Sequence, residues 1–185
     1  MVEATGSKQR YGRVAQALHW ITAILVLIAF LVGEGGPEQR VYSAERASQL
    51  TLHESLGLAV LIIVVARLAW RMVDRAPDEP PMPGWMTRSA VATHWILYLL
   101  LFAVPLTAIV GAWWEGHALT TYLGPIGPWF GGNGSSGHDF GAWIAELHTW
   151  LGDAILWVAG FHAAAALAHH FVLKDRVLLS MLPWK

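Results

Sequence analysis

The chain contains no cysteine among its 185 residues. This absence excludes disulfides, iron–sulfur clusters held by thiolates and zinc sites with cysteine ligands. Charged residues are also scarce, at 14% of the chain against about 25% in a soluble domain. The net charge is −1 and no run of basic residues is present, so nothing indicates nucleic-acid binding. Histidine, with nine copies, is the one soft metal ligand present in quantity.

Apolar residues are abundant instead. They make up 55% of the chain, and the mean hydropathy is +0.45. Eleven tryptophans fit this pattern, because tryptophan collects at the interfaces of a bilayer. A bilayer core of about 30 Å needs about 20 helical residues, and four apolar segments are long enough: residues 14–33, 50–70, 90–114 and 142–172. The sequence predicts an all-α, integral membrane four-helix bundle that forms one membrane domain over residues 1–185.

The first apolar segment is interpreted as a retained membrane helix rather than a signal peptide. It begins near Val14, behind three basic residues, and continues for about 19 residues to Val32 without a small-residue cleavage pattern. Arg10 and Arg13 are not adjacent, so the twin-arginine export signal is excluded as well.

Lysine and arginine are distributed unevenly over the connecting segments. Residues 34–49 and 115–141 are interpreted as loops on one side, and the proline-rich residues 74–88 as a loop on the other. Ten basic residues lie on the side of both termini, against Arg40 and Arg46 on the opposite side. The positive-inside rule therefore predicts that both termini are cytoplasmic. The opposite loops would face the periplasm if the membrane is the inner membrane of a Gram-negative bacterium. The ten are Lys8, Arg10, Arg13, Arg67, Arg71, Arg75, Arg88, Lys174, Arg176 and Lys185.

Five histidines lie inside the predicted helices at two matched depths. His53 and His148 are near the outer ends of their segments, whereas His19, His94 and His162 are on the inner half. Ionisable side chains in a bilayer are costly and mark functional sites. A single histidine in a helix is more often a hydrogen-bonded polar residue than a ligand, but the repeated depths favour metal ligation.

His148 and His162 are fourteen residues apart on the fourth segment. In a helix this separation is about four turns, so the two side chains lie within about 40° on one face and about 21 Å apart along the axis. They cannot bind one metal, but each can share a metal with a histidine at its own depth. His53 matches His148, and either His19 or His94 matches His162.

Such histidine pairs favour haem over other metal cofactors. Two axial imidazoles from facing helices are sufficient for a haem iron, because the porphyrin supplies the other four ligands. Zinc and di-iron sites need three or more ligands together, often carboxylates, and the nearest acids, Glu54 and Asp153, form no cluster. Gly57, Gly152 and Gly160 leave room for a flat macrocycle, although small residues serve helix packing equally well.

Several short motifs resemble one known family. The chain contains H-W in the first segment, H-E-x-x-G in the second, H-x-x-x-G in the fourth, and then GFHAAAALAHH and KD. From about residue 11 to residue 183, this pattern resembles the prokaryotic cytochrome b561 family, and especially its small diheme members that are linked to quinone. The block HAAAALAHHFVLKD is the most specific part. The motif residues are His19, Trp20, His53, Glu54, Gly57, His148 and Gly152.

The resemblance implies four helices that hold two haem b groups through paired histidines. His53 and His148 would hold the outer haem, as their depths also indicate, and His19 and His162 would hold the inner one. His94 would then be a polar residue beside the inner haem or the quinone pocket, and an ordinary interfacial position is the alternative.

The resemblance also implies a ubiquinone site near the cytoplasmic face. His169 and His170 lie one to two turns beyond His162, at head-group depth, where a histidine can donate to a quinone carbonyl and relay protons. Arg67 reaches the level of the inner haem on the second segment, so Arg67 or Arg71 is a candidate partner for the haem propionates. For all of these residues, ordinary placement at the membrane interface is the alternative.

The implied activity is electron transfer from a periplasmic one-electron donor to ubiquinone, with superoxide as the leading donor and dioxygen as its product. Superoxide is an anion that a basic funnel would attract, yet the outer loops carry six acids against Arg40 and Arg46. The alternatives are an electron carrier or quinol-linked cytochrome that serves a redox partner on residues 115–141, and a haem-bearing membrane anchor subunit. The six acids are Glu34, Glu38, Glu45, Glu115, Asp139 and Glu146.

Overall fold

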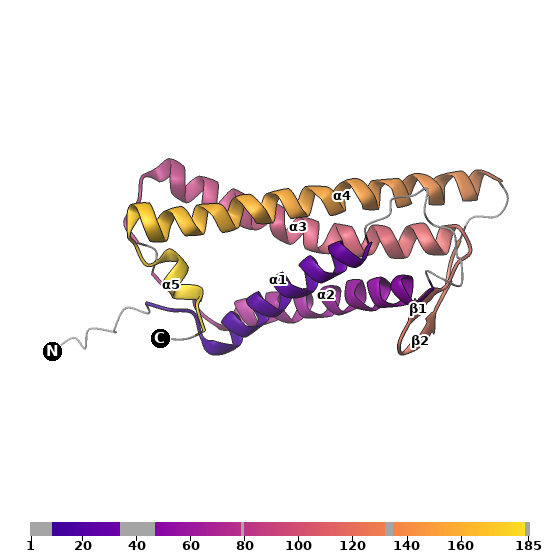
Figure 1. Cartoon of the computed structure of the whole chain (residues 1–185), viewed down its shortest axis with the longest axis horizontal. Coiled ribbons are helices and arrows are strands. Elements are labelled where there is room, and N and C mark those ends of the chain that lie inside the picture. Colours follow the sequence, from indigo (N-terminus) through magenta and orange to yellow (C-terminus); the bar gives the residue numbers. More distant parts are fainter. Residues whose placement is uncertain (1–8, 34–46, 79, 132–134, 184–185) are drawn as a thin grey trace.

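The computed structural model describes residues 9–33, 47–78, 80–131 and 135–183. Within these residues, four helices are long and apolar enough to cross a membrane. They are α1 (Arg13–Gly33), α2 (Ala47–Val73), α3 (Gly84–Trp114) and α4 (Ser135–Ala168). Figure 1 shows an elongated bundle in which α1 packs beside α2 and α3 beside α4. The predicted all-α membrane four-helix bundle is confirmed.

The helices extend beyond the apolar segments from which they were predicted. For example, α2 ends at Val73 rather than residue 70, and α3 begins at Gly84 rather than residue 90. Hydropathy marks only the part of a helix that crosses the hydrocarbon core, whereas backbone hydrogen bonding continues toward the head groups. Pro83 stands before the first turn of α3, where its missing amide hydrogen costs nothing.

The fourth helix changes its winding near its C-terminal end. α4 continues directly into a π-helical turn, η2 (His169–Leu173). Lys174 ends this turn in a left-handed conformation with φ of 54°, and its amide donates to the carbonyl of His169. Single π-helical turns within helices are rare. Those that do occur often lie at functional sites. The sequence pattern did not predict this turn.

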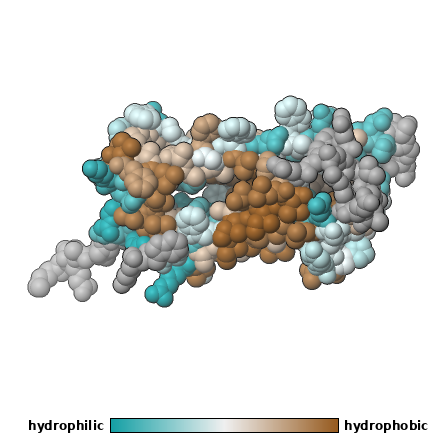
Figure 2. Space-filling view, viewed as in Figure 1, coloured by the Kyte–Doolittle hydropathy of each residue, from teal (hydrophilic) through white to brown (hydrophobic). Residues whose placement is uncertain are grey.

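Apolar side chains from three helices form the core of the bundle. Val60 and Val64 of α2, Leu100 and Leu101 of α3, and Ile155 of α4 are buried together. Many other large apolar side chains are exposed on the outside of the helices. Figure 2 shows a hydrophobic surface over the middle of the molecule, with hydrophilic residues toward its ends. Helices that are apolar on their outer faces as well are typical of a membrane bundle.

The interpretation of residues 115–141 as a loop is wrong for part of this segment. Two strands form an antiparallel hairpin there, β1 (Leu119–Thr121) and β2 (Gly124–Ile126). Its turn is stabilised locally, because the Thr121 hydroxyl donates to the Gly124 carbonyl (2.7 Å) and accepts from the Leu123 amide (3.2 Å). Gly124 has a φ of +106°, which glycine adopts readily. The glycine and proline content that indicated a loop therefore concealed a short hairpin.

The two described ends of the chain meet at one end of the bundle. A short helix, α5 (Val177–Met181), follows η2 and packs near the start of α1 (Figure 1). The Tyr11 amide donates to the Ser180 carbonyl (3.1 Å), and the Trp20 indole donates to the Met181 carbonyl (2.9 Å). Both ends therefore lie on the same side, as the predicted topology requires. Their cytoplasmic placement stays a prediction, and α5 was not predicted.

Candidate functional site

The two outer histidines face each other across the bundle. The ring centroids of His53 on α2 and His148 on α4 are 6.0 Å apart, and the rings are inclined at 83°. Each Nδ1 lies 2.8 Å from a backbone carbonyl oxygen, that of Ala29 for His53 and that of Val104 for His148. A carbonyl only accepts, so Nδ1 carries the proton and donates it. In this tautomer the lone pair that can bind a metal lies on Nε2 of each ring.

A second histidine pair lies deeper along the bundle. His19 on α1 and His162 on α4 have ring centroids 6.3 Å apart, at an angle of 73°. His94 on α3 is also close to His162, with centroids 5.5 Å apart. The structure thus brings together all three histidines that the sequence assigned to the inner level, with His162 in contact with both others.

The spacing of the rings can be compared with that of two axial ligands. Because a metal–imidazole bond is about 2.0 Å long, two imidazoles on opposite sides of one metal have centroids about 6 Å apart. The His53–His148 and His19–His162 separations match this spacing more closely than the His94–His162 separation does. This difference favours His19 over His94, a choice that depth along the helix left open.

A cavity of about 520 Å³ surrounds the inner histidines. Its volume is typical of small-molecule and cofactor sites, and it is lined mainly by apolar side chains with a few convergent polar groups. The polar residues that line it are His19, Thr22, Arg67, His94, Tyr98 and His162.

Arg67 is the cation of this cavity. Its guanidinium lies 2.9 Å from Nδ1 of His19 and 5.5 Å from the centre of the Tyr98 ring. A guanidinium only donates, so Nδ1 of His19 accepts in this arrangement, unlike Nδ1 of the two outer histidines. Arg71, one turn further along α2, is exposed and does not line the cavity. Of the two arginines predicted for this role, Arg67 is therefore the better placed to meet an anionic group.

Three glycines leave open space beside the histidines. Gly57 and Gly152 each follow an outer histidine by four residues, and a Cβ atom built on either would meet no atom within 4 Å. The same is true of Gly160, which lines the inner cavity. Among the residues that the structure describes, no three histidine or acidic side chains gather into a metal site. Paired imidazoles beside open space fit haem, which brings its own equatorial ligands.

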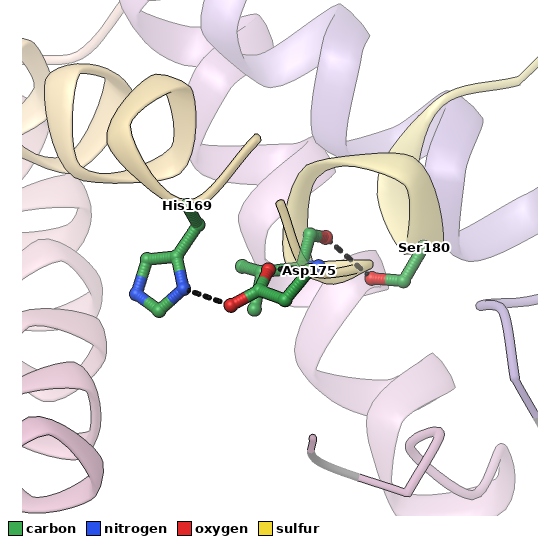
Figure 3. A network of polar contacts seen from close by, with 4 residues as sticks. His169, Asp175 and Ser180 are labelled. Carbon is green, nitrogen blue, oxygen red and sulfur yellow. Dashed lines mark hydrogen bonds and ion pairs between the residues drawn. The ribbon is translucent and has the colours of Figure 1, made fainter. Parts of the chain in front are cut away.

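The last predicted site residues lie in η2, directly after α4. Nδ1 of His169 is 2.5 Å from Oδ2 of Asp175, and the other carboxylate oxygen accepts from the Val177 amide at 3.0 Å. Figure 3 shows this network, which links η2 to α5. His170 contacts the Phe171 ring, with centroids 4.8 Å apart. The contacts of His169 and His170 thus differ, and neither residue lines the cavity that His94 shares with the inner pair.

Asp175 is a site residue that sequence reasoning missed. Partial burial opposes its ionisation, but the hydrogen bonds from His169 and from the Val177 amide outweigh this effect, so its pKa lies below the ordinary value. The charged carboxylate accepts from Nδ1 of His169 and so fixes the orientation of the ring. The KD motif contained this residue, but the sequence could not indicate that the chain folds back to His169.

Four membrane-spanning helices with facing histidines at two depths are typical of a b-type membrane cytochrome. The sequence model described as Prokaryotic cytochrome b561 matches residues 10–184. The chain belongs to this family, and the predicted resemblance is confirmed. It is accordingly a multi-pass bacterial membrane protein for electron transfer, from a family that binds haem b.

Curated relatives match this chain over nearly its full length. "Cytochrome b561 homolog 2" of Escherichia coli is 31% identical over 182 residues, which cover 96% of this chain and 94% of the relative. "Probable superoxide oxidase CybB" of Yersinia pestis is 31% identical, with 96% and 98% covered. "Cytochrome b562" of Cereibacter sphaeroides is 33% identical, with 93% and 94% covered.

Proposed function

We propose that this protein conducts single electrons across the bacterial inner membrane, from a periplasmic donor to ubiquinone near the cytoplasmic face. His53 and His148 would hold an outer haem b, and His19 and His162 an inner one. The observation that carries the proposal is the presence of two facing histidine pairs, with centroids 6.0 and 6.3 Å apart. Two such sites stacked along one bundle provide stepwise electron transfer across most of the membrane.

Haem bound in these sites supplies one-electron redox chemistry at its iron. The chain's own contribution is to hold the imidazoles in one orientation and in one tautomer. At the outer site, the carbonyls of Ala29 and Val104 do this by accepting from Nδ1. Such outer partners also make the ligating nitrogen more basic, and their loss typically costs 10–100-fold in metal affinity or activity.

The inner site differs, because Arg67 donates to Nδ1 of His19 and cannot accept a proton from it. For Nε2 of His19 to bind iron, the ring proton must lie at Nδ1, and Arg67 must then donate to a different acceptor. A haem propionate is such an acceptor, since a guanidinium matches a carboxylate in charge and geometry. The assignment of Arg67 to a propionate is supported by its position in the cavity wall, and Arg71 serves as a comparison.

The quinone end of the proposal rests on the groups beyond the inner pair. His169 is held through Nδ1 by Asp175, so its Nε2 is the free atom of the ring. With a proton on each ring nitrogen, His169 can donate from Nε2 to a quinone carbonyl while its Nδ1 donates to Asp175. His170 on the same turn and His94 beside the inner pair complete the set of groups proposed to line the path to the quinone.

Superoxide is proposed as the donor. Two superoxide anions each give up one electron and become dioxygen, and the two electrons with two protons reduce one ubiquinone to ubiquinol. A relative from Yersinia pestis carries the name of a superoxide oxidase, which supports this choice at 31% identity. The acidic outer residues oppose this choice, because their negative charge repels an anion.

The experiment is a rapid-mixing measurement on the purified protein with ubiquinone in lipid nanodiscs. A pulse of superoxide should reduce the haems within the mixing time, as followed by their absorption bands. One ubiquinol should then form for every two superoxide anions consumed. The matched control variant is His148→Ala, which should abolish the fast phase. Haems that stay oxidised after the superoxide pulse would overturn the assignment of superoxide as the donor.

A second function is favoured by one observation at the outer end. The hairpin exposes Tyr122 and Leu123, which are 69% and 91% accessible, and Trp129 beyond it is 77% accessible. Exposed aromatic and apolar side chains suit a docked redox protein, because such residues are enriched at protein interfaces. The same rapid-mixing measurement tests this function. It is favoured if ubiquinol reduces the haems and superoxide does not.

A further inference from the structure

The last turn of α1 contacts the imidazole of the outer histidine on α2. Ala29 and Gly33 are four residues apart, so they lie one above the other on the same face of α1. The Ala29 carbonyl accepts from Nδ1 of His53 at 2.8 Å. A Cβ atom built on Gly33 would lie 2.5 Å from both Cε1 and Nδ1 of the same ring. The edge of the imidazole therefore occupies the volume that a side chain at position 33 would take.

We propose that Gly33 is a positioning residue for the outer haem. Its missing side chain admits the ring of His53, and the Ala29 carbonyl then sets the rotation of that ring so that Nε2 stays free toward His148. This inference rests on the proposed function insofar as it takes His53 and His148 as the outer haem's ligands. It also means that α1, which carries the inner ligand candidate His19, fixes a ligand of the outer site.

The ring cannot easily avoid a larger residue at position 33. Contacts of 2.5 Å do not occur between real atoms of this kind, so the ring or the helix end would have to move. A ring that moves away from α1 lengthens and weakens its hydrogen bond to Ala29. A ring that turns about its own bonds redirects Nε2 away from His148. Either response disturbs the ligand geometry.

Backbone conformation gives no other reason for a glycine here. Gly33 is helical, and among the residues that the structure describes the glycines with positive φ are others, namely Gly116, Gly124 and Gly127. In a helix, alanine is more favourable than glycine by about 1 kcal/mol. Helix propensity alone would therefore make Gly33→Ala neutral or stabilising, and only the contact with His53 predicts the opposite sign.

The test compares Gly33→Ala with Gly84→Ala in the full-length protein purified with its haem. Gly84, at the cytoplasmic start of α3, is the control because a Cβ there meets no atom within 4 Å. Gly33→Ala should lower the haem content from two toward one per chain, or shift the low-spin electron paramagnetic resonance g values of the outer haem, while the inner signals stay unchanged. Gly84→Ala should change neither. Two haems with unchanged g values and reduction potentials in Gly33→Ala would overturn the inference.

A double-mutant cycle with His53→Ala keeps the inference testable if Gly33→Ala folds poorly. Removal of the ring leaves space for a methyl group at position 33. Gly33→Ala should therefore lower yield and thermal stability when His53 is present, and should have no such effect in the His53→Ala background. Equal destabilisation in both backgrounds would contradict the inference. The cycle also separates the two proposals. If the parent protein holds no outer haem, the proposed function is wrong, but the cycle still tests whether Gly33 contacts the His53 ring.

Discussion

His53 and His148 belong to different helix pairs, yet each donates from Nδ1 to a carbonyl of its own neighbour at the same distance of 2.8 Å. His53 on α2 bonds to Ala29 on α1, and His148 on α4 bonds to Val104 on α3. The two rings then face each other with centroids 6.0 Å apart. The candidate outer site is thus built from two equivalent halves, each with its histidine in the tautomer that places the lone pair on Nε2.

We expect His148→Ala to remove one haem and leave the other. The outer site would keep only one imidazole, whereas the inner pair is about four helical turns away and shares no contact with the substituted ring. The pyridine haemochrome assay should fall from two haems per chain to one, with the remaining spectrum unchanged. His138→Ala is the matched control, because His138 is exposed near the start of the same helix. Loss of both haems in His148→Ala, or of neither, would contradict the assignment.

Arg67→Gln should lower the reduction potential of the inner haem. A nearby positive charge stabilises the reduced state, which carries one more electron, so loss of the charge destabilises that state. If the reduced state loses about 1.4 kcal/mol of stability relative to the oxidised state, the one-electron reduction potential falls by about 60 mV. Spectroscopic redox titration measures the shift. Arg71→Gln should shift the potential less, because Arg71 is exposed and screened by water. Equal shifts for the two variants would remove the special role of Arg67.

The long apolar helices and the depths of the histidines could be predicted from the sequence. Runs of about 20 apolar residues identify helices in a bilayer, and a separation of fourteen residues puts His148 and His162 on one face of α4. Depth could not decide between His19 and His94, because it carries no information about how the helices are rotated against one another. The ring separations of 6.3 and 5.5 Å supply that information.

The features that the sequence did not reveal depend on contacts between distant segments. The carbonyls of Ala29 and Val104 are backbone groups, so no residue pattern marks them as partners of histidines. The hairpin and α5 are too short for a periodic pattern and are stabilised by tertiary hydrogen bonds. Gly33 carries no visible motif, and only the position of the His53 ring explains it.

Asp175 makes the stability of the segment from η2 to α5 dependent on pH. Its pKa in the folded protein is lower than the ordinary 3.8. The stabilisation is therefore fully present above this value and is lost as the pH falls below it, through the lowered pKa of the folded state. Thermal unfolding should show this loss in the parent protein and not in Asp175→Asn, which keeps the shape but does not titrate. An identical acid profile for both proteins would contradict the linkage.

Thr120→Val should loosen the hairpin from α2. The hydroxyl of Thr120 donates to the carboxylate of Glu54 at 2.7 Å, and the Thr120 amide donates to the same oxygen. Glu54 follows His53 directly in the sequence of α2. Loss of the hydroxyl bond should cost about 1 kcal/mol. Hydrogen–deuterium exchange should increase across the hairpin. Thr51→Val is the control, because Thr51 bonds only within α2, to Ala47. Unchanged exchange in the hairpin of Thr120→Val would show that this bond does not hold it.

The central claim is that the two facing histidine pairs each hold one haem b. It is tested most directly by counting haem b per chain in the purified parent protein, by pyridine haemochrome absorbance against quantitative amino-acid analysis. The account predicts two haems per chain, both low-spin with two nitrogen ligands by electron paramagnetic resonance. One haem per chain, none, or a high-spin haem with an open axial position would contradict it.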